Sequence, residues 1–383
     1  MVHLLLSVIY LSFISLGLPD GLLGAAWPSM YPEIGVSVDF AGIIAMIIAL
    51  GTIVSSLLSD RITCALGAGR VTAISVAMTA AALFGFSFST APWMLCLWAI
   101  PYGLGAGSVD ASLNNYVALH YSSRHMSWLH CMWGIGASVG PYVMGYILSG
   151  GGHWSAGYRT VGFLQVVLTA VLVLSLPLWK ARGAASGEKA AAPLSIRQIF
   201  ALPGAREILV AFFCYCALEQ TTALWASSYL ALYKGVRAET AAFFGSMFFI
   251  GITVGRGLNG FLTVKYSDTQ LIRLGQWIIG IGITAMVLPL GDWLSIAGLI
   301  LIGLGCAPIY PCIIHSTPEH FGPEKSQAMI GVQMASAYMG TLLMPPLFGL
   351  LADALTPALM PWYLLGILGL MVLMHEKLIR SVT

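Results

Sequence analysis

Charged residues are scarce in this chain, and long hydrophobic runs are abundant. Asp, Glu, Lys and Arg make up 8% of the 383 residues and hydrophobic residues make up 58%, whereas an ordinary soluble domain is about 25% charged. With a mean hydropathy of +0.87, the chain has more apolar surface than a soluble core can bury. The net charge is +2 and there is no basic run that could follow a phosphate backbone, so nucleic acid is not an expected partner.

Cysteine is also sparse, and its pattern argues against a metal site. The seven cysteines are scattered, odd in number and mostly within apolar segments, and none has metal-ligand spacing. Cys214 and Cys216 form only a C-x-C pattern within a predicted helix. We therefore expect buried free thiols and no bound metal.

Apolar runs of about 20 residues, the length needed to cross a bilayer, occur twelve times. The first follows directly after Met1-Val2-His3, which is unlike a cleavable signal peptide. We therefore expect an all-α polytopic membrane protein with twelve transmembrane helices. The predicted spans are 4–31, 38–59, 71–89, 92–119, 128–149, 158–179, 206–233, 239–264, 270–290, 293–316, 326–351 and 358–375.

One long polar gap divides the spans into two sets of six. It runs from Lys180 to Gly204, begins rich in Ala, Gly and Ser, and carries several charged residues. We interpret it as a cytoplasmic linker. The predicted organisation is an N-terminal six-helix bundle at 1–179, the linker at 180–204 and a C-terminal six-helix bundle at 205–383.

Lysine and arginine are distributed unevenly between alternate loops. If both termini are cytoplasmic, most of these residues lie on the cytoplasmic side, and the outer side holds only Arg159, Lys234 and Arg237. The positive-inside rule therefore predicts a multi-pass protein of the cytoplasmic (inner or plasma) membrane with both termini inside.

The two halves resemble each other at an offset of about 200 residues. Gly103-Leu104-Gly105-Ala106 matches Gly303-Leu304-Gly305-Cys306, and Gly51-x-x-Val54 matches Gly251-x-x-Val254. Ordered matches on either side of a central linker indicate an internal duplication with pseudo-symmetric halves. Two further matches are Gly136, Pro141 and Gly145 with Gly340, Pro345 and Gly349, and Asp20 and Trp27 with Glu219 and Trp225.

Three carboxylates, Asp20, Asp110 and Glu219, lie inside predicted spans. A charged side chain at the centre of a bilayer costs about 2.5–3.5 kcal/mol on insertion scales, so such residues usually lie on a path for protons, ions or substrate. We expect all three to take part in proton coupling and to contact the transported ligand.

Asp20 lies between Pro19 and Gly21, which interrupt the first helix and free backbone groups that a cavity must satisfy. The pattern is typical of a binding site. The alternative is that the carboxylate caps the restarted helix.

Asp110 is followed one helical turn later by Asn114, with Asn115 on a flanking face. A carboxylate with two carboxamides offers donors and acceptors suited to vicinal hydroxyl groups. The alternative role is hydrogen bonding between helices, worth about 0.6 kcal/mol per contact.

Glu219 is followed by Gln220 in the seventh span. It could bind substrate, a proton or Na⁺, or pair with an arginine of a neighbouring helix as a gate. Arg256, within the eighth span, is expected to be a structural or gating cation rather than a ligand.

Other polar and aromatic residues in the spans are weaker candidates, because each is also common in helix packing. His130 could relay a proton or donate to a ligand, and aromatic rings could pack against the C–H face of a sugar. The remaining expected substrate-binding residues are His130, Trp133, Gln220, Trp225, Asn259, Tyr310 and Gln333.

The arrangement of two six-helix halves joined by a basic linker resembles the major facilitator superfamily over the whole chain. Ser59-Asp60-Arg61 and Gly69-Arg70, between the second and third spans, are similar to the superfamily signature Gly-x-x-x-Asp-Arg-x-Gly-Arg. Ser56 stands where the signature has its first glycine, and extra residues precede Gly69. The resemblance implies that Asp60, Arg61 and Arg70 form a gating latch; the alternative is a solvated basic loop.

Within that superfamily the chain looks most like the branch of fucose and glucose permeases. Leu18-Pro19-Asp20-Gly21 in the first span and the run from Gly103 to Asp110 in the fourth carry this likeness. The branch has an acid in each of these spans, tied to proton coupling and sugar binding, which here would be Asp20 and Asp110. The fourth-span acid is often glutamate in the branch, and the shorter aspartate reaches less far.

The resemblance implies proton-coupled uptake of a neutral monosaccharide, a hexose or deoxyhexose, by alternating access in a monomer. No cofactor is expected; H⁺ is the expected coupling ion and Na⁺ is the alternative. The main alternative function is a proton-coupled efflux antiporter for drugs, since Gly136-x-x-x-Gly140-Pro141 resembles a motif of antiporters. An intramembrane enzyme built on Asp20 and Asp110 is disfavoured by the duplicated plan.

Overall fold

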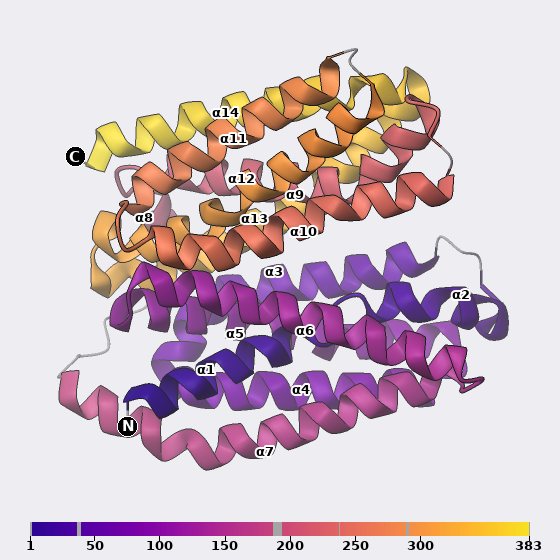
Figure 1. The fold of residues 1–383 in the computed structure, drawn as a ribbon. Helices are drawn as coiled ribbons and strands as arrows, with labels where there is room; N and C mark the ends of the chain where they lie inside the picture. The colour runs from indigo at the N-terminus through magenta and orange to yellow at the C-terminus, as the bar shows by residue number, and fades with distance from the viewer. Residues whose placement is uncertain (1, 37–39, 187–193, 237, 289–290, 383) are drawn as a thin grey trace. The chain divides into compact units, whose positions relative to one another are not determined.

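The computed structural model describes residues 2–36, 40–186, 194–236, 238–288 and 291–382, and no β-strand occurs in these ranges (Figure 1). The helices are α1 (Val2–Gly17), α2 (Leu22–Ile34), α3 (Phe40–Leu66), α4 (Ala68–Phe88), α5 (Pro92–His120), α6 (Ser123–Ser149), α7 (Trp154–Ser186), α8 (Ile196–Phe200), α9 (Ala205–Leu232), α10 (Ala238–Leu262), α11 (Asp268–Val287), α12 (Asp292–Phe321), α13 (Pro323–Ala354), the short 3₁₀ helix η1 (Pro357–Leu359) and α14 (Met360–Val382).

The expected all-α polytopic membrane fold is confirmed. Ten segments of the described residues are long and apolar enough to cross a membrane, and the first of them, Leu4–Trp27, runs through α1 into α2. The other two predicted spans are α5, which carries the polar residues around Asp110, and α10, whose apolar part Met247–Leu262 is shorter. Together these elements account for the twelve predicted spans.

The predicted linker contains more helix than its composition suggests. Helix α7 continues to Ser186, and the short helix α8 follows further along. Helix α8 starts at a capping box, in which the Ser195 side chain accepts from the Gln198 N–H and the Gln198 side chain accepts from the Ser195 N–H. Residues 187–193 of the linker, including Lys189, lie outside the described residues, as does Arg237 of the predicted outer loops.

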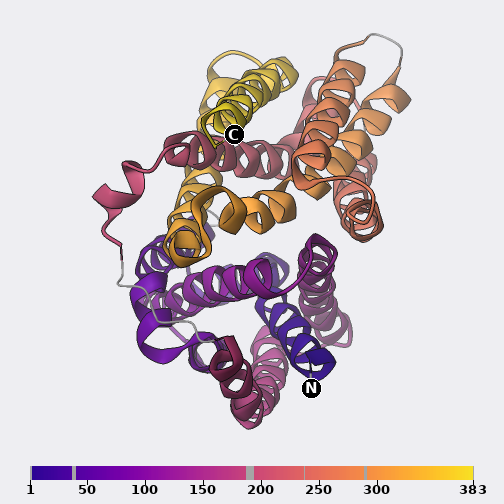
Figure 2. The same ribbon diagram turned by 90° about the vertical axis from the view of Figure 1, so that its left-hand side faces the viewer.

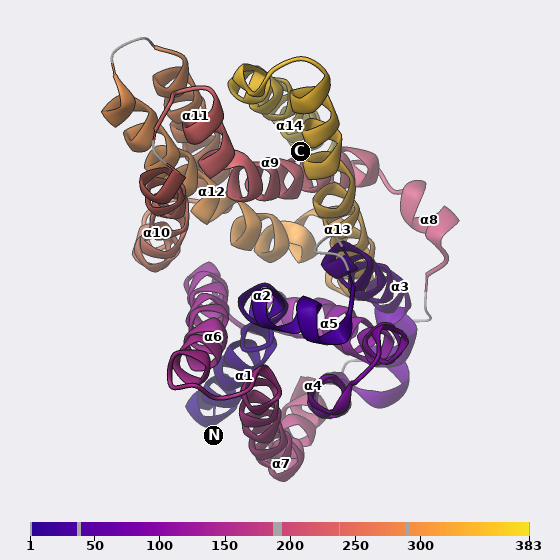
Figure 3. The same ribbon diagram turned by 90° about the vertical axis from the view of Figure 1, so that its right-hand side faces the viewer.

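The chain divides into two compact units. Unit 1 holds Met1–Tyr116 and Leu129–Leu194, and unit 2 holds Val117–Trp128 and Ser195–Thr383. In unit 1, α7 packs along α4 and contacts α1 and α2 (Figure 2). In unit 2, α12 packs against α10 and α11, while α9 packs against α13 and α14 (Figure 3). The division of the chain into domains 1–179, 180–204 and 205–383 stays a prediction.

The internal duplication is visible as the same close helix crossing in both units. A Cβ added to Gly103 of α5 would overlap the Ile48 carbonyl oxygen of α3, and one added to Gly303 of α12 would overlap the Phe248 carbonyl oxygen of α10. Gly51 and Gly251 face these crossings from the opposite helix. Glycine at matching positions therefore lets the helix backbones touch at matching places in each bundle.

A second pair of crossings joins the first and fifth membrane spans of each half, α1 with α6 and α9 with α13. Gly136 of α6 lies against the Ile14 carbonyl of α1, and Gly340 of α13 lies against the Phe213 carbonyl of α9. One turn after Gly136, Gly140 lies against the Leu18 carbonyl oxygen. The motif Gly136-x-x-x-Gly140-Pro141 thus has a packing role in this chain.

We expect Gly140→Ala to destabilise the protein, because the new methyl group would overlap the Leu18 carbonyl oxygen and push α6 away from α1. Overpacking of this kind costs about 1–3 kcal/mol. Gly134→Ala on the same helix is the matched control, since nothing lies within 4 Å of its added Cβ. Thermal unfolding of the purified variants in detergent should show a lower midpoint for Gly140→Ala alone; equal midpoints would contradict the packing role.

The first span is broken at the segment that carries Asp20. Helix α1 ends at Gly17 and α2 begins at Leu22, and Gly21 adopts φ 75°, a left-handed conformation that favours glycine. A Cβ at Gly17 would overlap the Trp133 carbonyl oxygen of α6, and one at Gly21 would lie 2.9 Å from the Pro141 ring. The break is therefore held against one face of α6.

The end of α2 is tied to the beginning of α7 by Glu33. Its Oε2 atom accepts from Trp154 Nε1 and lies next to His153 Nε2, both at 2.7 Å. The Trp154 N–H is the main cause that holds the pKa of Glu33 below its ordinary value, and His153 adds in the same direction. The Trp154 indole is buried beside Trp27 and Met30, so the helix that begins after Asp20 is anchored at its far end.

Candidate functional site

The Asp20 carboxylate lies in the break of the first span and accepts two side-chain hydrogen bonds. Trp133 Nε1 of α6 donates to Oδ2 at 3.0 Å, and the Tyr102 hydroxyl of α5 donates to Oδ1 at 3.4 Å. Each oxygen of the carboxylate therefore faces one donor from a different helix, and the acid is held by α5 and α6 rather than by the backbone of its own helix. The restarted helix α2 has Gly21 at its N-cap and no side-chain cap, so the alternative capping role of Asp20 is not present in this structure.

A second polar group of unit 1 is a chain of hydrogen bonds between α5 and α6. Asn114 Nδ2 donates to Asp110 Oδ1 at 2.7 Å and to the Asp110 carbonyl at 2.9 Å. The Asn114 side-chain oxygen faces His130 Nε2 at 3.1 Å. All three side chains are buried, with Asp110 4% and Asn114 0% exposed. The i, i+4 spacing read from the sequence thus places Asp110 and Asn114 on one helix face, as predicted.

The Asp20 and Asp110 carboxylates lie within electrostatic range of each other. The His130 ring also meets Phe13 of α1 edge to face, with ring centroids 5.4 Å apart. Asn115 is 7% exposed on a neighbouring face of α5. Unit 1 therefore holds two polar groups within an otherwise apolar bundle, one at the break of the first span and one between α5 and α6.

Unit 2 contains a buried ion pair. Arg256 Nη2 of α10 lies 3.5 Å from Glu219 Oε1 of α9, and the two side chains are 6% and 12% exposed. The sequence left open whether Glu219 faces a ligand or pairs with an arginine of a neighbouring helix. The structure shows the pair, with Arg256 as the partner.

Tyr310 of α12 lies in an aromatic group of unit 2. Its ring meets Phe212 at 4.8 Å and Tyr215 at 6.0 Å between centroids, both edge to face. Its hydroxyl donates to Met334 Sδ at 3.1 Å. Tyr215 is fully buried and lies within electrostatic range of Glu219, so the aromatic group adjoins the ion pair.

The structure places four other predicted ligands in separate surroundings. Trp225 donates to the Pro345 carbonyl at 2.9 Å and packs edge to face on Phe348. Gln333 is fully buried and accepts from Thr317 Oγ1 at 3.1 Å. The other two are Gln220, which is exposed on α9, and Asn259, whose side chain donates to Ser127.

The signature residues, expected in a loop between the second and third spans, lie on helices instead. Asp60 and Arg61 belong to α3 and Arg70 to α4, and Asp60 has a clear partner. Asp60 Oδ2 accepts from the Leu194 N–H at 3.1 Å, and the Cys64 thiol lies 3.7 Å from Oδ1. Arg61 and Arg70 are exposed. Asp60 therefore anchors the chain just before α8, and the latch role of the three charged residues stays a prediction.

Three features of the site were not foreseen from the sequence. The first is Tyr102, which no local pattern distinguishes from a tyrosine that only packs in an apolar span. Ser15 of α1 and Gln165 of α7 exchange two hydrogen bonds, of 2.5 and 2.6 Å, near the helix break. Ser55 of α3 and Ser108 of α5 pair at 2.6 Å. These contacts join residues about 50 or 150 positions apart in the chain, and no local pattern signals them.

The fold and the site define a polytopic transporter built from two duplicated helical bundles. The chain belongs to the Major Facilitator Superfamily, whose family model matches residues 9–245 and 208–379. It is accordingly a transporter and not an enzyme, and its membership in this family makes a small solute the expected cargo.

Three known proteins are similar to this chain over most of its length. An uncharacterized transporter, y4wD, of Sinorhizobium fredii is 24% identical over 377 residues, covering 94% of this chain and 96% of that protein. The fucose:proton symporter FucP of E. coli, in its outward conformation, gives a TM-score of 0.76 at 16% identity over 99% of both chains. The proton:xylose symporter XylE gives a TM-score of 0.79 at 11% identity over 99% of this chain and 95% of that one. At these identities the two solved structures, both of sugar symporters, show the fold alone.

Proposed function

We propose that this transporter takes up a neutral monosaccharide, a hexose or deoxyhexose, together with a proton by alternating access. In this proposal it works as a monomer in the cytoplasmic membrane with both termini inside. The observation that carries the proposal is the Asp20 carboxylate, held in a broken membrane helix by Trp133 and Tyr102.

This geometry supports a direct link between proton and sugar. An ionised carboxylate is only an acceptor and engages donors at both oxygens, whereas a protonated one becomes a donor itself and needs fewer. Proton binding to Asp20 would release at least one of its two donors, the Trp133 indole N–H and the Tyr102 hydroxyl. The released donor would then be free to bind a sugar hydroxyl, and the half-buried Trp133 ring could pack on the C–H face of the sugar. Proton binding thereby prepares the sugar site.

The hydrogen-bonded group of Asp110, Asn114 and His130 also supports proton-coupled sugar uptake. Asp110, Asn114 and His130 offer a carboxylate, a carboxamide and an imidazole in a row, which suits a ligand with several hydroxyl groups. Asp110 lies within electrostatic range of Asp20. We therefore assign proton coupling to these two carboxylates jointly and sugar recognition to the polar side chains around them.

The charge balance of unit 2 favours a neutral ligand. Arg256 is buried and already faces the Glu219 carboxylate, so this cation is not available for an anionic sugar such as a phosphate or a carboxylate. In the proposal the pair acts as a gate or structural element, and Tyr310 contributes an aromatic surface. The other predicted ligands of unit 2, Gln220, Trp225, Asn259 and Gln333, remain candidates with lower priority.

A proton-coupled efflux antiporter is the second candidate function. The specific observation in its favour is that Asp20 lies between an indole and a phenol, an arrangement that also suits a lipophilic cation. The two candidates differ in the chemistry of the ligand and in the direction of its movement relative to the proton.

Uptake into proteoliposomes under an imposed pH gradient tests the proposal. A panel of labelled hexoses and deoxyhexoses should include one sugar that accumulates when the outside is acid and equilibrates when the gradient is collapsed. A parallel gradient of Na⁺ should have no effect. If no sugar moves and cationic dyes move against the proton gradient instead, the symporter proposal fails and the antiporter replaces it.

A further inference from the structure

A short segment that lies between two stretches of unit 1 in the chain packs with the helices of unit 2. The segment Val117–Trp128 contains the end of α5 and the beginning of α6 and belongs to unit 2, whereas its chain neighbours Tyr116 and Leu129 belong to unit 1. Helices α5 and α6 carry Asp110, Asn114, His130 and Trp133. The contacts that hold this docking segment therefore bear on the helices of the proposed proton site.

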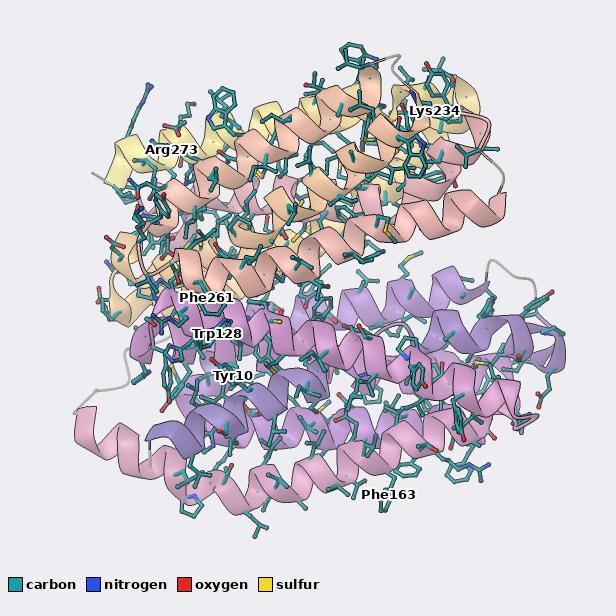
Figure 4. The ribbon with its side chains drawn as sticks, in the orientation of Figure 1. Tyr10, Trp128, Phe163, Lys234, Phe261 and Arg273 are labelled. Carbon is teal, nitrogen blue, oxygen red and sulfur yellow. The ribbon has the colours of Figure 1, made fainter. Side chains whose placement is uncertain are left out.

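One part of the docking is a packed joint with the end of α10. Asn259 Nδ2 donates to Ser127 Oγ at 2.8 Å, and both side chains are buried. Trp128 meets Phe261 edge to face at 5.8 Å (Figure 4). A Cβ at Gly260 would overlap the Trp128 indole, so the ring lies directly on the α10 backbone.

The other part of the docking is polar and centres on His315 of α12. Its Nδ1 atom lies 2.5 Å from Asp268 Oδ2 at the start of α11, and its Nε2 atom lies 3.2 Å from the Tyr121 carbonyl oxygen in the docking segment. The second oxygen of Asp268 accepts from Ser123 Oγ, also in the docking segment, at 2.5 Å. The carboxylate and the imidazole thus each hold one end of the same turn.

The partners of His315 determine which protonation state fits. A carboxylate oxygen and a peptide carbonyl are both acceptors, and an imidazole donates at both nitrogens only when it is protonated. A neutral ring that keeps its N–H toward Asp268 would direct a lone pair at the Tyr121 carbonyl. The other neutral tautomer would keep the bond to Tyr121 and lose the one to Asp268. Only the charged ring therefore makes both bonds, and it ties Tyr121 to the carboxylate that also holds Ser123.

We propose that His315 and Asp268 form a second proton-binding site, separate from the carboxylates of the transport site, which holds the docking segment on unit 2 while the proton is bound. Glu319, one turn further along α12, also lies within electrostatic range of the ring, and His320 lies within range of Asp268. On the docking segment itself, Arg124 lies over the Trp128 ring and His125 bonds to Ser122. Further charged or titratable residues near these helix ends are His120, Lys265, Glu324 and Lys325.

The site makes the docking sensitive to pH on one side of the membrane. On the orientation assumed in the proposed function, that side is the cytoplasm, into which a symporter releases protons. Cytoplasmic acidification would keep His315 charged and the segment docked, and a more alkaline cytoplasm would release it. Accumulated protons would then slow further turnover through a group that takes no part in substrate binding.

Hydrogen exchange of the purified protein in nanodiscs, followed by mass spectrometry from pH 5.5 to 8.5, tests the site without any substrate. After correction for the intrinsic effect of pH on exchange, peptides covering 117–128 should lose about tenfold in protection as pH rises, the change expected when one charged hydrogen bond is lost. Peptides from α14 should show no such loss. Because the readout needs no sugar, it can succeed or fail independently of the proposed transport activity.

Variants identify the titrating group. His315→Gln should give low protection of 117–128 at every pH, and Asp268→Asn should do the same. Two matched controls should keep the wild-type pH response: His153→Gln, which alters a histidine next to Glu33 in unit 1, and His125→Gln, which alters a histidine on the docking segment with a different partner. A wild-type profile that does not depend on pH, or a His315→Gln profile that follows the wild type, would overturn the proposal.

Discussion

Asp20→Asn is expected to abolish accumulation of sugar driven by a pH gradient while sugar exchange across the membrane survives. The asparagine cannot take up a proton, and it presents one oxygen where the carboxylate presents two. At least one of the donors Trp133 and Tyr102 is then released. The variant therefore resembles the proton-loaded state, which in the proposed mechanism is the one that binds sugar.

The expected size of this effect follows from the energy of the gradient. A difference of about two pH units stores about 2.7 kcal/mol per proton, which allows up to about 100-fold accumulation if one proton moves with each sugar. We expect the wild type to approach this ratio and Asp20→Asn to stay near 1. The measurements are the final accumulation ratio and the rate of exchange with unlabelled sugar inside the vesicles.

Two companion variants sharpen the result. Trp133→Phe removes only the donor to Asp20 Oδ2 and keeps a ring of similar shape, so it should weaken sugar binding and retain coupling. Asp110→Asn separates the roles of the two carboxylates. One result would contradict the link through Trp133 and Tyr102: Asp20→Asn still accumulates sugar fully, whereas Asp110→Asn does not. Proton coupling would then be assigned to Asp110.

The sequence predicts the fold well because the bilayer imposes a length and a composition on every span. The twelve helices and the duplication follow from that constraint, and glycines such as Gly103 and Gly303 mark the same crossing in each half. The break at Pro19-Asp20-Gly21 was also recognisable, since proline and glycine both disfavour a continuous helix. Within a helix, spacing alone placed Asn114 beside Asp110.

Contacts between distant residues were not predictable from one sequence. Tyr102 reaches Asp20 because α5 packs beside the break, and nothing in its own neighbourhood distinguishes it from other aromatic residues. The Asn259 amide donates to Ser127, a partner 132 positions away that no local pattern indicates. His315 was recognisable only as a polar residue near a span end, because its partners Asp268 and Tyr121 lie 47 and 194 positions away.

Arg256→Met is the second substitution with a large expected effect. It leaves the Glu219 carboxylate in a site where its side chain is 12% exposed and removes its cationic partner. Removing one member of a buried ion pair costs about 3–5 kcal/mol, because the remaining charge is left uncompensated. The midpoint of thermal unfolding in detergent should therefore fall well below that of the wild type.

A control pair in the same unit separates burial from charge. Arg273 makes two hydrogen bonds to Glu376, of 2.6 and 2.8 Å, but the side chains are 45% and 34% exposed. Exposed pairs contribute about 0–1 kcal/mol, so Arg273→Met should change the midpoint little. If Arg256→Met is no more harmful than Arg273→Met, the pair with Glu219 is not the source of stability.

The double variant Arg256→Met/Glu219→Gln decides what the pair does. Removing both charges eliminates the unpaired carboxylate, so the double variant should recover most of the stability lost by Arg256→Met alone. A recovered protein that still accumulates sugar under a pH gradient would make the pair a structural or gating element, as proposed. If stability returns while coupling is lost, Glu219 takes part in carrying the proton, and the coupling path extends into unit 2 beyond Asp20 and Asp110.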